Sequence, residues 1–346
     1  MNYLIFRTDR IGDFLIISPL LHAIKKKDID ANIFVVSSPK NDVFINKNIL
    51  ADKVFLLKKN NIYNKMILLF KLKKYKFDTI IVSDKKNRSI LLTLFLKSKN
   101  KIFNVSKNFQ KKLLSLIFKN VFLDNDYQKN CSVKEVLISN SKAINCNLED
   151  EDFHYLKKNQ FKNNFIHKEI FDLENTNYLI FHYDEKWEIE NYTKAFIKAS
   201  TFTNIEINFN DFLDFLSNLS KKNSKKVIIT TGMIKTKIIK NLIATSKKIN
   251  EFIYEFDLNN QKGYLFINQN FFSISHLISM SSMFISCHGA LTHIASIYKI
   301  KILDVIEEKK QNHYNRITHH MINYKYLFRN NFDKLSKEII NFSLKL

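Results

Sequence analysis

The chain of 346 residues is long enough for about two domains, and its 45% of hydrophobic residues allow sizeable cores. The net charge of +22 indicates either an anionic partner, such as nucleic acid, a membrane surface or a phosphorylated substrate, or a compositional bias towards Lys, Asn, Ile and Phe. Because the lysines occur along the whole chain and no zinc-finger spacing, RNP-like aromatic motif or basic arm is present, we do not expect nucleic-acid binding.

The sequence also predicts where the protein works. It has no apolar run of roughly 18 residues that could span a membrane, and its start lacks the pattern of a signal peptide. The three cysteines, Cys131, Cys146 and Cys287, are odd in number and have no metal-ligand spacing. We therefore expect a cytoplasmic protein, and the positive charge favours peripheral contact with the anionic cytoplasmic face of the inner membrane.

The first half of the chain alternates strand-like and helix-like patterns. An apolar strand over residues 3–6 leads through a polar turn into an apolar helix that ends near residue 25. Such alternation predicts a parallel sheet with helices on both faces. We place the domain connection near residues 150–175. The further expected strands cover 33–36, 54–57, 79–82 and 101–105, and the helices cover 63–72, 89–96 and 133–144.

The second half repeats the alternation, so the sequence predicts an α/β protein with two Rossmann-like domains. Ligands of such sheets bind at the carboxyl ends of the strands, and we expect the two domains to face one cleft. The expected strands cover 178–182, 227–230, 263–267, 283–286 and 302–306, and the helices cover 192–201, 209–219, 235–247, 271–280, 291–298 and about 333–344.

The most specific motif lies between the first strand and the first helix, where residues 7–21 read RTDRIGDFLIISPLL. This segment resembles the amino terminus of the family 9 glycosyltransferases, the bacterial lipopolysaccharide heptosyltransferases. Their pattern is an Arg-containing loop, Gly-Asp, and an apolar run with Pro and Leu. The resemblance implies that Asp13 is the catalytic base and places Arg7, Arg10 and Gly12 at the acceptor. The residues alone allow a second interpretation, in which Asp13 only caps the helix.

A second motif follows the first strand of the second domain, where residues 181–187 read FHYDEKW. It resembles a Lys and a Trp that family members carry after this strand. The resemblance implies that Lys186 reaches the donor diphosphate and stabilises the leaving group, a role that suits a mobile point charge. The alternatives are a solvent-exposed Lys186 and a Trp187 that packs under the strand end, which we favour over base stacking.

The third motif, residues 284–296, reads FISCHGALTHIAS: a buried strand, a Gly turn and a helix of small residues. The start of a helix offers N–H groups and a favourable dipole to an anion. The family has a related strand, Asp-Thr-Gly and helix, with a His soon after the Gly. Here Cys287-His288 replaces Asp-Thr, and the spacing from Gly289 to His293 is one residue longer.

The donor site expected from this resemblance combines the third motif with Lys186 and with the Gly loop that follows strand 227–230. A plain turn at that Gly loop is the alternative we favour, and His293 on a packed helix face is another. The donor-binding residues that we expect are Lys186, Thr231, Gly232, His288, Gly289, Ala290, Thr292 and His293.

Several histidines gather after the last strand, at His313, His319 and His320. Their spacing lacks the His-Glu-x-x-His pattern and a nearby paired acid, so we expect no metal. Arg316 in the same stretch is a candidate contact for an anionic acceptor.

The resemblance covers most of the chain and implies the GT-B fold. Residues 1–165 would form the acceptor-side domain, residues 175–330 the nucleotide-sugar-binding domain, and residues 331–346 a helix that crosses back to the first domain. The implied reaction is inverting transfer of heptose or a similar sugar from a nucleoside diphosphate sugar to a lipopolysaccharide-type, lipid-linked or other surface glycan, without a cofactor. The altered Cys287-His288 pair keeps open a nucleotide-sugar hydrolase or epimerase, or an inactive nucleotide-sugar-binding protein.

Overall fold

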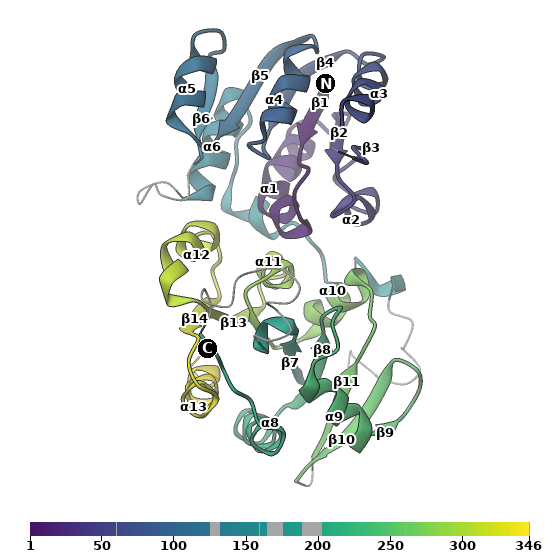
Figure 1. The fold of residues 1–346 in the computed structure, drawn as a ribbon, viewed down its shortest axis with the longest axis vertical. Helices are drawn as coiled ribbons and strands as arrows, with labels where there is room; N and C mark the ends of the chain where they lie inside the picture. Colours follow the sequence, from purple (N-terminus) through teal and green to yellow (C-terminus); the bar gives the residue numbers. More distant parts are fainter. Residues whose placement is uncertain are drawn as a thin grey trace. The chain divides into compact units, whose positions relative to one another are not determined.

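The chain folds into two compact α/β units, each built around one sheet (Figure 1). This architecture confirms the prediction of two Rossmann-like domains. The first unit comprises Met1–Tyr155 and Asn312–His320, and the second comprises Leu156–Gln311 and Met321–Leu346. The computed structural model describes residues 1–59, 61–124, 132–158, 160–164, 176–188, 203–259 and 261–345. The helix expected at 192–201 and Cys131 lie outside this part of the chain.

The first unit contains a six-stranded sheet in the order β3-β2-β1-β4-β5-β6, and its strands pair in parallel. The strand order reverses between β1 and β4, and the crevice outside the carboxyl ends of such neighbours is where ligands bind. The strands are β1 (Asn2–Phe6), β2 (Asn32–Ser37), β3 (Lys53–Leu56), β4 (Phe77–Val82), β5 (Ser98–Val105) and β6 (Asn120–Leu123).

Helices cover both faces of this sheet. The chain runs from β1 to β2 in one direction and from β4 to β5 in the other, so right-handed crossovers place α1 and α4 on opposite faces. α1 continues through Pro19, and its apolar side is buried. The helices are α1 (Ile11–Lys27), α2 (Asp42–Asn46), α3 (Ile62–Leu72), α4 (Asn87–Leu94), α5 (Asn108–Ser115) and α6 (Val133–Ala143).

The second unit contains an eight-stranded sheet in the order β14-β13-β12-β7-β8-β11-β10-β9. Among the described strands, β10 pairs antiparallel with both β9 and β11 and forms a hairpin with β11, whereas the other neighbours in this sheet pair in parallel. The strand order reverses at β7 and β12. The strands are β7 (Tyr178–Tyr183), β8 (Lys226–Thr231), β9 (Lys247–Lys248), β10 (Ile253–Leu258), β11 (Gln261–Phe266), β12 (Met283–Cys287), β13 (Lys301–Ile306) and β14 (Tyr324–Phe328).

The last helix packs inside the second unit, where α13 contacts α8, β13 and β14. The returning segment that groups with the first unit is instead Asn312–His320, which contains most of α12. None of the described helices combines the length and the apolar composition that crossing a bilayer requires. The returning helix is α12 (Gln311–Thr318), and the helices of the second unit are α8 (Phe209–Asn223), α9 (Lys237–Thr245), α10 (Phe271–Met280), α11 (Ala290–Ile297) and α13 (Phe332–Ser343).

Candidate functional site

Asp13 lies in the first turn of α1, directly after the turn that leaves β1. Its Oδ2 accepts a hydrogen bond from the backbone N–H of Arg10 at 3.0 Å, and its Oδ1 lies 3.3 Å from Nη2 of Arg7. The first contact is the helix-capping interaction that the sequence allowed. The side chain nevertheless remains 38% exposed, so capping and access to a ligand coexist in this carboxylate.

Arg7 fixes this turn from below. Its side chain is almost completely buried, and its Nε donates to the backbone oxygen of Asp13 at 2.9 Å. Its Nη1 donates to the backbone oxygen of Ser83 and lies 3.6 Å from Oδ2 of Asp9. Because the guanidinium makes all of these contacts at once, it orients the carboxylates next to it. In this geometry Arg7 positions Asp13.

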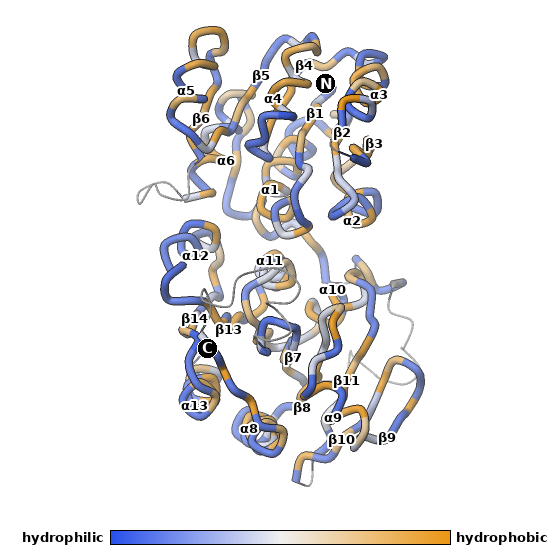
Figure 2. Tube along the Cα trace, viewed as in Figure 1, coloured by the Kyte–Doolittle hydropathy of each residue, from blue (hydrophilic) through white to orange (hydrophobic). Residues whose placement is uncertain are grey.

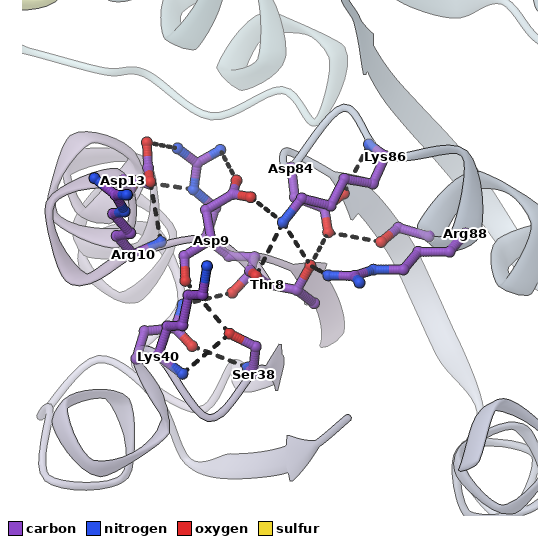
Figure 3. Close-up of polar contacts among 12 residues, drawn as sticks. Thr8, Asp9, Arg10, Asp13, Ser38, Lys40, Asp84, Lys86 and Arg88 are labelled. Carbon is purple, nitrogen blue, oxygen red and sulfur yellow. Dashed lines mark hydrogen bonds and ion pairs between the residues drawn. The ribbon is translucent and has the colours of Figure 1, made fainter. Parts of the chain in front are cut away.

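A network from β4 meets this turn (Figure 3). Asp84 is buried after the end of β4 and accepts hydrogen bonds from Oγ1 of Thr8 at 2.5 Å and from Oγ of Ser89 at 2.6 Å. Lys86 forms an ion pair with Asp9 and donates to the backbone oxygen of Thr8 at 3.0 Å, while Nη2 of Arg88 donates to Oγ1 of Thr8 at 2.8 Å. Sequence reasoning missed this network, although polar residues 83–86 directly after an apolar strand are a signal for it.

Several of these side chains, Thr8, Asp9, Asp13, Lys86 and Arg88, border an open pocket of about 710 Å³ in the first unit. That volume lies within the usual range of small-molecule sites. Five of the bordering side chains are cationic and two, Asp9 and Asp13, are acidic. The pocket therefore suits a polar ligand that carries negative charge. Gly12 is not among the bordering residues, which are Thr8, Asp9, Arg10, Asp13, Ser38, Pro39, Lys40, Leu57, Lys58, Lys86 and Arg88.

In the second unit, Lys186 occupies the carboxyl end of β7. Its Nζ lies 2.8 Å from Oδ2 of Asp184 and donates to the backbone oxygens of Cys287 and His288 at 3.1 Å and 2.9 Å. Burial disfavours the charged form of Lys186, but the Asp184 carboxylate outweighs this effect and raises the pKa of the ammonium above its ordinary value. Lys186 is therefore a fixed positive charge that ties the end of β7 to the β12–α11 turn.

Two glycines allow the loops around Lys186 to approach one another. A Cβ on Gly289 would lie 2.8 Å from Nζ of Lys186, and a Cβ on Gly232 would lie 2.6 Å from Oε2 of Glu185. Thr231 is paired with Tyr183 on the neighbouring strand. The structure thus brings the Lys186, Gly232 and Gly289 loops close together.

His288 is held by a carboxylate that sequence reasoning missed. Its Nδ1 lies 2.5 Å from Oδ2 of Asp304, a fully buried residue on β13, which also accepts from the hydroxyl of Tyr324 at 3.0 Å. Oγ1 of Thr292 accepts from the backbone N–H of Gly289 at 3.1 Å and so caps α11. A single Asp inside the apolar strand 302–306 was the available signal.

Other predicted residues of the second unit lie close by. Ala290 begins α11, and the buried ring of His293 meets the ring of His288 edge to face at 5.3 Å. Trp187 is fully buried against Phe181, in agreement with the packing role favoured from the sequence. Burial raises the pKa of the Cys287 thiol to about 12, against the opposing effect of Arg329, so this thiol is not a reactive nucleophile.

His313, His319 and His320 follow β13 and precede β14. Among the described residues, no group of three or more His, Cys, Asp or Glu side chains is placed to hold a metal ion. Arg316 is buried in an ion pair with Asp124, which also contacts Nζ of Lys85 at 2.9 Å. In this geometry Arg316 serves packing within the first unit.

The sequence matches no protein-family model and no curated protein. Several solved structures share its fold over the whole chain. Heptosyltransferase WaaC of E. coli with ADP has a TM-score of 0.61 at 11% identity, over 100% of this chain and 99% of that chain. A family 9 glycosyltransferase of Veillonella parvula has 0.62 at 12%, over 100% and 97%, and the E. coli ADP-heptose LPS heptosyltransferase II has 0.63 at 10%, over 100% and 99%. At these identities the likeness establishes the fold, which is GT-B, as predicted.

Proposed function

We propose that this protein is a glycosyltransferase that moves a sugar from a nucleoside diphosphate sugar to a hydroxyl of a glycan or lipid-linked acceptor, with inversion. The observation that carries the proposal is Asp13, whose half-exposed carboxylate borders the 710 Å³ pocket while Arg7 and the Arg10 N–H fix its two oxygens. The GT-B fold supports it, because the structure of similar fold from E. coli holds ADP.

In the proposed reaction, Asp13 takes the proton of the acceptor hydroxyl as its oxygen attacks the anomeric carbon. The new C–O bond forms while the bond from that carbon to the diphosphate oxygen breaks, and in-line attack inverts the configuration. The nucleoside diphosphate leaves with the electron pair. Arg7 holds the carboxylate in place for the proton, and a positioned base of this kind contributes about 10²–10⁴ to the rate.

The donor diphosphate is assigned to the second unit, at Lys186 and the start of α11. The raised pKa of Lys186 keeps its ammonium charged at neutral pH, as stabilisation of a leaving diphosphate requires. The glycine at 289 lets the start of α11 approach Nζ of Lys186, which a Cβ at that position would meet at 2.8 Å. The proposed reaction takes place in the cytoplasm.

The acceptor is assigned to the basic pocket of the first unit. The pocket is bordered by more cationic than acidic side chains, which supports an acceptor with phosphate or carboxylate groups, such as a lipopolysaccharide-type glycan. Against two acids, the cationic side chains are Arg10, Lys40, Lys58, Lys86 and Arg88.

The first experiment measures donor binding. Nucleoside diphosphates and their sugars should raise the melting temperature of the protein, because they bind only the folded state. Products are then analysed with and without acceptor. Sugar release that ignores the acceptor would indicate a hydrolase or epimerase, and binding without turnover on any acceptor would indicate an inactive binding protein; either result contradicts the proposal.

The second experiment separates a base from a helix cap. Asp13→Asn keeps an acceptor for the Arg10 N–H but removes the basic carboxylate, so turnover should fall by about 10²–10⁴ while the donor-induced shift in melting temperature persists. Asp42→Asn, which changes a first-turn Asp of α2 outside the pocket, is the matched control and should keep full turnover. If Asp13→Asn keeps near-normal turnover while Asp13→Ala loses turnover, Asp13 acts only as a helix cap and not as the base.

A further inference from the structure

Three helices of the first unit are apolar on the side that faces away from the sheet. On α3 the outward residues Ile62, Met66 and Phe70 repeat every four positions, and Tyr63 and Ile67 extend the same stripe. Similar stripes run along α4 with the residues that follow it, and along α5. We call these exposed side chains the apolar face: Ile62, Tyr63, Met66, Ile67, Phe70, Leu91, Leu94, Phe95, Phe109, Leu113, Leu116 and Ile117.

These residues are strongly exposed even though the same helices bury other apolar residues against the sheet. α3 buries Leu68, Leu69 and Leu72 against the sheet, while Ile62 remains 73% exposed and Phe70 61% exposed. A surface helix of a soluble domain normally carries polar residues on its outward side. Figure 2 shows apolar residues among the polar ones along α3, α4 and α5, and the exposed fractions identify which of them face outward.

The apolar face lies on one side of one sheet. Inward residues of α3, α4 and α5 share a single core with Leu4 and Phe6 of β1 and with Ile80 and Val82 of β4. Alternate residues of a strand point to opposite faces, so the three helices cover the same face of the sheet. Their outward stripes consequently belong to one continuous surface of the first unit.

The positive charge of the protein is concentrated in the segment of the chain that carries the apolar face. Residues 53–123 contain 18 Lys or Arg and two acids, Asp78 and Asp84, which leaves 37 Lys or Arg and 31 acids for the rest of the chain. Both acids are engaged inside the unit, because Asp84 is buried and Asp78 accepts from the backbone N–H of Asn2 at 2.9 Å. The exposed basic residues around the face include Lys58, Lys59, Lys71, Lys73, Lys74, Lys97, Lys107, Lys111, Lys112 and Lys119.

We propose that the apolar face is a membrane-docking surface and that its partner is an anionic phospholipid bilayer. Lysines around an apolar patch satisfy both parts of such an interface: the ammonium groups meet the phosphates, and the apolar side chains enter the boundary between headgroups and acyl chains. This inference goes beyond the transfer reaction and does not depend on it.

Other occupants fit the same surface less well. A second copy of the chain would place the same patch against itself in a two-fold dimer, so that lysines would face lysines. Nucleic acid would satisfy the lysines but would leave the large apolar side chains in water. A bilayer docked on the apolar face would also lie near the pocket. Lys58 and Arg88 border that pocket and stand at the beginnings of the segments that form α3 and α4.

The first test measures co-sedimentation with phosphatidylcholine vesicles with and without phosphatidylglycerol, at low and high salt. Binding should require the anionic lipid and should weaken with salt, because the lysines contribute through screened attraction. The triple variant Ile62→Ser, Met66→Ser, Phe70→Ser should bind at least about tenfold more weakly. The control changes exposed apolar residues of the second unit, Met233→Ser and Ile322→Ser, and should bind like the unchanged protein.

The second test asks which side chains enter the lipid. The single Trp187 is fully buried, so vesicles with brominated acyl chains should not quench its fluorescence. Phe70→Trp should be quenched by these vesicles, and Met233→Trp, on the second unit, should not. Equal quenching of both variants, or vesicle binding that survives the triple change, would overturn the proposal. So would an apolar-face variant that converts a dimer into a monomer while no vesicles bind the unchanged protein.

Discussion

The two units use the same edge of the same kind of sheet in different ways. In the first unit, the carboxyl ends of β1 and β4 border an open pocket, and its acids remain accessible, with side chains 21% exposed at Asp9 and 38% at Asp13. In the second unit, Asp184 follows β7, Asp304 lies within β13 and Glu307 follows β13, and each is almost completely buried. Topology fixes where a site lies, and burial of the charges decides whether the site is rigid or open.

Their outer surfaces differ as well. The first unit exposes the apolar face and carries most of the net positive charge, whereas the large apolar side chains that stay exposed in the described part of the second unit are Met233, Ile322 and Leu344. A rigid, buried ion-pair network suits a ligand with constant parts, such as a diphosphate. An open basic pocket beside a membrane-docking surface suits a larger and more variable partner.

The largest expected effect tests the contrast in burial. Asp304→Leu removes the acceptor of His288 and Tyr324 inside the second unit, and the free energy of unfolding should fall by about 3–5 kcal/mol. Asp9→Leu removes a partly exposed acid of the first unit, and the loss should stay below about 1 kcal/mol. Urea denaturation measures both. If the Leu variant at 304 does not fold, Asp304→Asn provides the smaller, measurable loss, and equal losses at the two positions would contradict the contrast.

A change of pH should instead affect both units. Burial lowers the pKa of His182 in the second unit to about 4 and that of His320 in the first unit to about 3. Because each folded pKa lies below the unfolded value of 6.5, the neutral form stabilises the fold fully above pH 6.5, and this contribution is lost as the pH falls from 6.5 towards the folded values. Between pH 7 and 4.5, each histidine should lower the free energy of unfolding by roughly 2–3 kcal/mol.

The variants His182→Gln and His320→Gln locate this effect. Each should remove its own share of the pH-dependent loss in denaturation curves recorded at the two pH values. If only one variant changes the dependence on pH, acid sensitivity belongs to one unit alone and the two units differ in this property too.

A pair of glycines sharpens the description of the second unit. On Gly263→Ala the new Cβ would lie 2.4 Å from the ring of Phe256, which must move within the core, so unfolding should become easier by about 1–2 kcal/mol. On Gly289→Ala the clash is with Nζ of Lys186, the end of a flexible side chain. This variant should lose less than about 1 kcal/mol but should lose the nucleotide-induced shift in melting temperature; thermal melts with and without nucleoside diphosphate separate the two results.

The sequence predicted the features whose residues are contiguous along the chain and missed those whose residues meet only in the fold. The β1–α1 turn was predictable because strand, polar turn, Asp13 and apolar helix are contiguous. Asp84 and Arg88 were not, since they reach Thr8 across 76 and 80 residues, through the parallel pairing of β1 with β4. No periodicity within one segment reveals which strands become neighbours.

Asp304 and the β10–β11 hairpin are the features of the second unit that the sequence did not predict. Asp304 meets His288 because β12 and β13 pair with Ser286 opposite Asp304, a register that the sequence does not contain locally. The hairpin of β10 and β11 did leave a signal, because residues 253–258 alternate as a strand does, and Asn259 adopts the positive φ that a tight turn needs. The expectation of parallel strands throughout the second half left this hairpin unpredicted.

The smallest expected effect bears on the contrast between the outer surfaces. Phe70→Ser replaces a side chain that touches mostly solvent, so the free energy of unfolding should change by no more than about 0.5 kcal/mol, like that of Met233→Ser in the second unit. Leu69→Ala, one position away and buried, should lose about 2–4 kcal/mol in the same urea experiment. A small effect at Phe70 together with weaker vesicle binding would assign the apolar face to the membrane. A loss comparable to that at Leu69 would mean that Phe70 packs against another part of the protein, and the apolar face would then be part of its interior.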